Sequence, residues 1–465
     1  MFRKILSFIR DWIKSMIGKQ NVKTALNIDL AISGDMASAL EQWSRMYADD
    51  AEWINQDVRS MGLAAAIAGE IARSATIEME VEFSGSARAA FLETEFERVM
   101  NKLRYQVEFG CAKGGLIFKP YVAGDRIAVD FVQADQFYPV AFDADGDIIS
   151  VVFVDQRRKG DVWYTRLEYH AMTEQGCQIT NMAYKSSNKQ TLGQKVALAS
   201  IDEWATLEDE ALITAVDRPL YAYFRYPLAN NIDPDSPLGV SCYSRAVDLI
   251  KQADTQWSRL LWEFEAGEMA LFVDELAFGK TDDGKARLPH KRLYRALDTG
   301  GAADDLFKEW APNLREQNIL SGLDAILKRI EYVTGLAYGT LSDPNTVDKT
   351  ATEIKISKQR TYATIVDTQK SLEQALEQLI WCMDVWATIG GLAPAGTYEV
   401  AFQFDDSVVV DRDTQFQQDL RLVSQGLMSK VEFRMRNFGE KEDLARKALA
   451  DVDAERQPMM IPEVE

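Results

Sequence analysis

Histidine is nearly absent from this chain of 465 residues, which contains only His170 and His290. Because histidine is the side chain that most often carries acid–base and zinc chemistry near neutral pH, its scarcity disfavours both. The four cysteines lie far apart, with neither a Cys-x-x-Cys pair nor the density of a disulfide framework. The sequence therefore predicts no cofactor, no metal and reduced thiols, as in a cytosolic setting.

Long apolar runs are also missing. No segment approaches the ~18 consecutive apolar residues that a membrane-spanning helix requires, so we expect no membrane insertion. The N-terminal segment lacks a small-residue cleavage site, so we expect no signal peptide either. A chain of this length has a prior of about three structural units at ~150 residues each.

Three clustered aspartates raise the question of a metal site. Asp143, Asp145 and Asp147 resemble part of a calcium loop, but the EF-hand spacing is not met, so a hairpin turn is favoured. Asp405 and Asp406 could bind magnesium, although neighbours on a strand point to opposite faces. A pair of rim carboxylates is the favoured interpretation of these two.

The motifs of common enzymes are missing as well. Gly279-Lys280-Thr281 ends like a phosphate loop, but the first glycine of that motif would fall on Asp274. Neither a nucleophile elbow nor an HExxH zinc motif is present. We therefore predict no catalytic residue and no enzymatic activity.

The charge is strongly acidic, with 52 Lys and Arg against 72 Asp and Glu and a net charge of -20. An acidic surface disfavours tight wrapping of nucleic acid, because phosphates bind to basic surfaces. Residues 1–19 reverse this balance, with five basic residues against Asp11, and their apolar residues fall at helical spacing. This basic amphipathic helix either packs on an acidic surface of its own or a neighbouring subunit, which we favour, or docks on a membrane.

A second basic region lies in residues 279–295, where only Asp282 and Asp283 oppose the positive charge. A solvated loop and a docking surface for an acidic partner or DNA remain open with equal weight. The basic side chains that would make such contacts are Lys280, Lys285, Arg287, Lys291, Arg292 and Arg295.

Periodicity predicts an α+β fold. Helical spacing dominates as far as Gly110, and alternating segments with turn residues then predict a β-rich region up to Tyr226. Ser241 is predicted to cap a helix that runs to Gly267, and a second helix is expected over 314–336.

A polar segment from Gly339 to Thr350 reads as a loop, and a helix of about forty residues follows it. Thr350 and Glu353 form the capping box of that helix, in which Glu353 reaches back to the cap amide. A strand at Tyr398 and three short helices, interrupted at Gly426, complete the chain.

Three sequence features in this order resemble those of a tailed-bacteriophage portal protein. They are Pro237-Leu-Gly-Val-Ser with the helix that follows, the capping box at Thr350 heading a long helix, and Gly426-Leu-Met-Ser before short helices. The resemblance implies a mainly helical portal fold with a β-rich wing, a helical stem, a small α/β clip, a long wing helix and a short helical crown.

The same resemblance implies domain boundaries: an N-terminal helix, the wing, stem helix 1, the clip, stem helix 2, the tunnel loop, the long wing helix with its strand, and the crown. These are residues 1–24, 25–236, 237–267, 268–312, 313–338, 339–350, 351–412 and 413–465. The tunnel loop would project into a channel through Thr340, Ser342, Asp343, Asn345, Thr346, Asp348 and Lys349.

The resemblance further implies a homo-oligomeric ring, commonly of twelve subunits, at the portal vertex of a virion assembled in the host cytoplasm. Double-stranded DNA would pass through the ring during packaging and ejection. Terminase large subunit and head-completion or adaptor proteins would dock on the clip, and major capsid and scaffolding proteins would contact the wing. The alternative is a membrane- or capsid-associated scaffold anchored by the N-terminal basic helix.

Overall fold

The computed structural model describes residues 19–77, 79–274, 294–297, 307–310, 312–343, 351–404 and 412–455. The chain divides into two compact units, residues 1–402 and 403–465. Helices and largely antiparallel sheets both contribute, so the predicted α+β class is confirmed. No helix among the described residues is both long and apolar enough to cross a bilayer.

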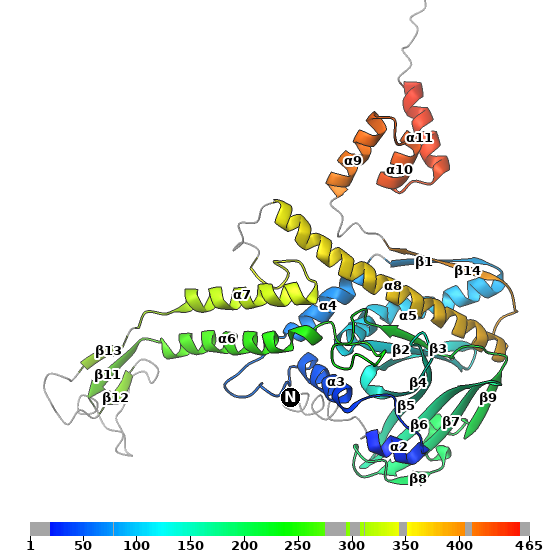
Figure 1. Ribbon diagram of the computed structural model, residues 1–465, viewed down its shortest axis with the longest axis horizontal. Helices are drawn as coiled ribbons and strands as arrows, with labels where there is room; N and C mark the ends of the chain where they lie inside the picture. Colours follow the sequence, from blue (N-terminus) through cyan, green and yellow to red (C-terminus); the bar gives the residue numbers. More distant parts are fainter. Residues whose placement is uncertain are drawn as a thin grey trace, which may run out of the picture. The chain divides into compact units, whose positions relative to one another are not determined.

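The first unit begins with four helices, α2 (Lys19–Leu26), α3 (Gly34–Tyr47), α4 (Leu63–Thr76) and α5 (Ala87–Lys113), of which α3, α4 and α5 pack together (Figure 1). The alanine-rich α4 packs on α5, and its Ile67 and Ile71 are completely buried. Gly114, with φ of 86°, ends α5 in the left-handed conformation that favours glycine.

Two sheets follow α5. β2 (Gly115–Ala123) is the central strand between β3 (Arg126–Gln133) and β10 (Ala222–Arg225). The larger sheet has the order β4-β5-β6-β7-β8, with β9 also paired to β7. Its strands are β4 (Phe137–Phe142), β5 (Ile148–Lys159), β6 (Val162–Thr173), β7 (Gly176–Ser186), β8 (Gln194–Val196) and β9 (Glu210–Thr214).

The three clustered aspartates form the turn between β4 and β5. The Asp143 carboxylate accepts hydrogen bonds from the backbone N–H groups of Asp145 (3.0 Å) and Asp147 (2.8 Å). Among the described residues, no group of acidic, histidine or cysteine side chains is arranged to hold a metal ion. The hairpin turn predicted from the sequence is confirmed.

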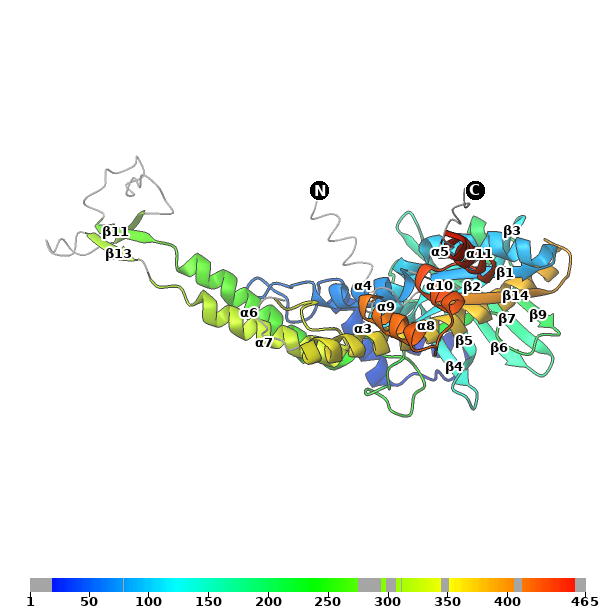
Figure 2. The same cartoon turned by 90° about the horizontal axis from the view of Figure 1, so that it is seen from above.

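Two paired helices, α6 (Val247–Ala266) and α7 (Glu316–Thr334), extend away from the sheets and lie side by side in both views (Figures 1 and 2). Beyond them lies a sheet in which β11 (Ala270–Asp274) pairs parallel with β12 (Tyr294–Leu297) and antiparallel with β13 (Phe307–Trp310). The sequence predicts a small α/β clip over residues 268–312. Its described residues are all strand or loop.

The predicted cap of the first stem helix is wrong. Ser244–Ala246 is a short 3-10 turn and α6 begins only at Val247. Ser241 Oγ instead accepts from the N–H of Tyr243 (3.3 Å). The buried Tyr243 hydroxyl donates to Trp43 O (3.0 Å), and this contact holds the chain in a turn before the helix can start.

The long helix α8 (Ala351–Ile389) has 39 residues, or about 58 Å at 1.5 Å per residue. It packs against β2, β10, α4 and α5, and Leu372, Leu376 and Leu379 are completely buried there. Neighbours from its own chain therefore cover much of this helix. The following strand β14 (Tyr398–Phe404) pairs with β1 (Met79–Gly85), three hundred residues earlier.

The second unit contains α9 (Arg412–Ser424), α10 (Lys430–Phe438) and α11 (Glu442–Glu455). Phe416, Phe433 and Phe438 pack edge to face between α9 and α10. Ser429 Oγ accepts from the N–H of Glu432 (3.0 Å) and caps α10. The three short helices and the break at Gly426 agree with the sequence pattern.

Candidate functional site

The C-terminal end of α7, which we call the stem base, is organised by one buried carboxylate. Glu331, on α7, is 0% exposed, and its Oε1 accepts from the N–H groups of Gly339 (3.1 Å), Leu341 (2.6 Å) and Ser342 (2.9 Å). Its Oε2 accepts from Ser342 Oγ (2.9 Å). A carboxylate with several hydrogen bonds to backbone amides fixes the path of the chain that supplies them. Glu331 therefore holds residues 339–342 against the end of α7.

Aromatic rings join this turn to α8. The Arg360 guanidinium lies over the rings of Tyr332 (4.7 Å to the centroid) and Tyr338 (5.1 Å). Gly335 ends α7 with φ of 80°, and Thr361 Oγ1 donates to its carbonyl (3.2 Å). We call Glu331, Tyr332, Tyr338, Ser342 and Arg360 the stem-base cluster.

The loop of residues 53–61 is attached to α6 through Asp254. This side chain of α6 is nearly fully buried and accepts from Trp53 Nε1 (2.9 Å) and Met61 N (2.8 Å). Burial raises the pKa of Asp254, although both hydrogen bonds favour the charged carboxylate. Arg59 N donates to Ser258 Oγ (2.8 Å) one turn later, so the loop runs along α6.

At the outer end of the stem, Arg315 binds Glu263 in a forked contact. Arg315 Nη2 lies 2.7 Å from Glu263 Oε2, and both Nε and the backbone N of Arg315 donate to Oε1. Hydrogen bonding to Arg315 lowers the pKa of Glu263. This pair joins the end of α6 to the start of α7, on either side of the segment that contains β11–β13.

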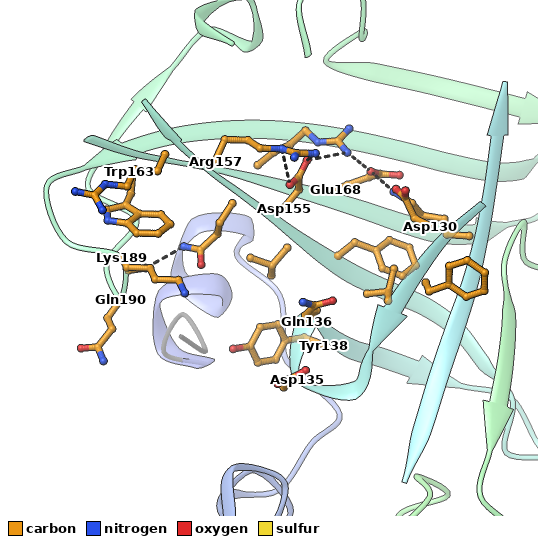
Figure 3. Close-up of a pocket in the computed structure, with 18 of the residues that line it drawn as sticks. Asp130, Asp135, Gln136, Tyr138, Asp155, Arg157, Trp163, Glu168, Lys189 and Gln190 are labelled. Carbon is orange, nitrogen blue, oxygen red and sulfur yellow. Dashed lines mark hydrogen bonds and ion pairs between the residues drawn. The ribbon is translucent and has the colours of Figure 1, made fainter. Parts of the chain in front are cut away.

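A groove of about 950 Å³ is lined by residues of β3, β5 and β6 (Figure 3). Its lining includes Glu168, which contacts Lys119 Nζ (2.8 Å), Arg166 Nη2 (2.9 Å) and His170 Nε2 (2.7 Å). Burial by itself would raise the pKa of Glu168, but Lys119, His170 and Arg166 outweigh it and hold that pKa well below its usual range. We call this site the wing groove.

The predicted tunnel-loop residues divide into two sets. Asp343 and Thr340 lie beside the stem base, where Asp343 N donates to Asp324 Oδ1 (3.1 Å) and Thr340 Oγ1 donates to Ala337 O (2.7 Å). Ser342 is 5% exposed and bonded to Glu331, so the expectation that its side chain projects into a channel is wrong. The remaining positions lie outside the described residues: Asn345, Thr346, Asp348 and Lys349.

Most of the other predicted site residues also lie outside the described part of the chain. Arg295 belongs to β12, and Glu353 belongs to the first turn of α8, but their side chains are not described. Those beyond the described residues are Lys280, Lys285, Arg287, Lys291, Arg292 and the helix cap Thr350. The contacts predicted for all of them stay predictions.

Sequence reasoning missed Glu331, Glu168 and Arg360. Glu331 offers one signal in the sequence, because it adjoins Ile330 on the buried side of α7. A charged residue next to a buried helical position indicates a hydrogen-bonded partner elsewhere. The identity of that partner is not visible in the sequence.

Comparison with known proteins identifies the family. A family model described as "Phage portal protein, SPP1 Gp6-like" matches residues 86–457, about four fifths of the chain. A search of curated proteins gave no match. Among solved structures, a chain from the "Neck of native GTA particle computed with C12 symmetry" has 12% identity and a TM-score of 0.41, covering 89% of this chain and 97% of that chain.

The chain belongs to the phage portal protein family. It is therefore a structural protein of the bacteriophage virion, at the head-to-tail connector, and the resemblance noted in the sequence is confirmed.

Proposed function

We propose that copies of this chain close into a ring, commonly of twelve subunits in the family, through which double-stranded DNA enters the capsid and later leaves. In this proposal α6 and α7 form the stem, β11–β13 the clip, and the sheets with α8 the wing. The terminase large subunit and head-completion or adaptor proteins dock on the clip, while major capsid and scaffolding proteins contact the wing. Assembly takes place in the host cytoplasm.

The observation that carries this proposal is the apolar surface of the stem. Trp262 is 62% exposed, and further large apolar side chains on or beside α6 and α7 are exposed as well. Large apolar side chains exposed along two helices suit a surface that another protein covers. A closed ring of head-to-tail interfaces covers such a surface in every subunit. The other exposed residues are Phe264, Leu314, Leu320 and Tyr332.

The charge balance supports passage of DNA in place of tight binding. A wall of Lys and Arg would release counterions and hold the duplex, whereas an acidic or neutral wall leaves it mobile. The net charge of -20 therefore suits a conduit.

Negative-stain images of the purified protein test the ring, with Trp262→Ser and Leu320→Ser combined as the variant. The wild type should show rings with a central hole, and the double variant should shift toward monomers because it removes exposed apolar area from the interface. Glu265→Ser, at an exposed position of the same helix, is the matched control and should keep its rings. A wild type that stays monomeric even with its scaffolding and capsid partners would refute the proposal.

The clip contacts have a separate test. Reversing the charge of Lys291, Arg292 and Arg295 together should reduce DNA packaging while leaving the rings intact. If the rings dissociate instead, these residues belong to the interface between subunits.

A further inference from the structure

The wing groove has an aromatic floor and a mixed polar rim. Phe131, Val132 and Phe153 line it from β3 and β5, and Trp163 lines it from β6. Figure 3 shows Trp163, Lys189 and Gln190 at one end and Glu168 with Asp130 at the other. Its volume of about 950 Å³ is at the upper end of the ~300–1,000 Å³ range of ligand pockets. The groove can therefore take several side chains of a partner.

Several cations of the groove are ion-paired with its own carboxylates, although its lining has five Lys and Arg residues against four Asp and Glu residues. Glu168 binds both Lys119 and Arg166, and Arg157 Nε lies 3.2 Å from Asp155 Oδ1. Because paired cations offer little to a further anion, these positions do not form a phosphate site.

Carboxylate oxygen remains available at the rim. The Asp130 side chain is 51% exposed, and its contact with Lys119 is long, at 3.8 Å. Asp135 Oδ2 binds Lys113 (2.5 Å), whereas its buried Oδ1 has no hydrogen-bond partner among the described residues. Asp130 therefore has acceptor capacity at the surface for an incoming basic group, whereas the free oxygen of Asp135 lies below the surface.

The chain itself supplies such a group next to the groove. Residues 1–18, which lie outside the described part, lead directly into α2 (Lys19–Leu26), and the Asn21 side chain donates to the backbone oxygen of Gln190 (3.3 Å). In Figure 3 the faint blue ribbon of the N-terminal region coils beside Lys189 and Tyr138. Eighteen residues span about 27 Å as a helix, which is enough to cross the groove.

We propose that the wing groove is the docking site of this chain's own N-terminal segment, residues 1–18. The apolar face of the segment covers the aromatic floor, and its basic residues meet Asp130 at the rim. This inference does not depend on the ring. The apolar residues of that face are Phe2, Ile5, Leu6, Ile9, Ile13, Met16 and Ile17.

Crosslinking of the full-length chain tests the docking. The four native cysteines are buried, so a short bis-maleimide should react selectively with two introduced cysteines, Ile9→Cys and Gln190→Cys. The control pairs Ile9→Cys with Leu212→Cys, which is similarly exposed. Leu212 lies opposite Gln178 on β7, eight residues from Ser186 and so about 26 Å along the sheet from the groove end. Tethering concentrates the docked segment at the groove, so the Gln190 pair should crosslink at least about fivefold more than the control.

A second variant shows whether the apolar face is responsible. Ile5→Asp with Ile13→Asp, added to the Gln190 pair, should lower the crosslink yield about tenfold because two buried side chains are lost from the contact. Equal yields at Gln190 and Leu212, or an unchanged yield in the aspartate variant, would overturn the proposal. So would crosslinks that join different chains, detected by mixing isotopically light and heavy protein. Sedimentation with phosphatidylserine vesicles, combined with equal yields at both positions, would reassign the segment to a membrane surface.

Discussion

The stem base and the wing each bury a glutamate, but the two carboxylates are satisfied in different ways. Glu331 accepts three backbone N–H groups and one hydroxyl, and no cation among the described residues forms an ion pair with it. Glu168 is held by the side chains of Lys119 on β2 and of Arg166 and His170, which lie two residues away on its own strand β6.

The difference separates two structural roles. A carboxylate that binds backbone amides specifies where the chain itself runs, and at Glu331 that chain leads from the stem toward α8. A carboxylate that binds cations of its own strand and of another sheet specifies side-chain positions on a surface whose backbone the strand ladders already fix. The predictions below test this distinction.

The largest expected effect is at the stem base. Glu331→Ala should lower the free energy of unfolding by about 4 kcal/mol, because it leaves three buried backbone N–H groups without an acceptor. Glu331→Gln keeps an acceptor oxygen for those groups and should cost about 1–2 kcal/mol. Chemical denaturation gives the stability, and amide hydrogen exchange at residues 339–342 locates the loss. Equal exchange at these amides in both variants would contradict the assigned role.

Glu168→Ala should lower the free energy of unfolding by about 3 kcal/mol, because it leaves Lys119 and Arg166 buried without a counter-charge. Hydrogen exchange at residues 339–342 should stay unchanged in this variant. Faster exchange of the amides of residues 339–342 in Glu168→Ala would contradict the separate roles of the two glutamates.

The Glu168 site should also make stability depend on pH. The folded pKa of Glu168 lies below its unfolded value of about 4.3, so its contribution is present above that pH and is lost as the pH falls toward the folded pKa. Denaturation midpoints between pH 6 and 3 should therefore fall less steeply for Glu168→Gln than for the wild type. Parallel curves for the two proteins would contradict this assignment.

The junction of α7 with α8 gives a smaller effect. Residue 335 has a left-handed backbone conformation, and Gly335→Ala places a Cβ against Thr364. This variant should lower the free energy of unfolding by about 2 kcal/mol. Gly391→Ala is the matched control, because Gly391 has φ of 60° and open space around its Cβ position. The control should cost only about 1 kcal/mol. Equal losses of thermal stability would show that contact with α8 is unimportant.

The smallest effect is expected at the loop on α6. Trp53→Phe removes the donor to Asp254 while keeping most of the ring, and should cost about 1 kcal/mol. The loop should then become more sensitive to limited proteolysis. Unchanged cleavage of residues 53–61 would show that the backbone bonds to Asp254 and Ser258 suffice.

The limits of sequence reasoning follow from the range of the interactions involved. The bounds of α8 could be predicted because a capping box, a long apolar face and Gly390-Gly391 are local signals. The start of α6 could not, because the buried contact of Tyr243 with Trp43 joins residues two hundred positions apart. Ser342 looked like any polar loop residue until its bond to Glu331 became visible.

The sequence alone determined the acidic balance, the order of helices and strands, and the family, because composition, periodicity and motif order are properties of the linear chain. Only the tertiary structure decided which polar groups share one buried environment. Glu331 meets residues 339–342 through a turn of the chain, and Glu168 meets Lys119 from another sheet. Desolvation makes such pairings selective, because a buried charge without partners is too costly to keep.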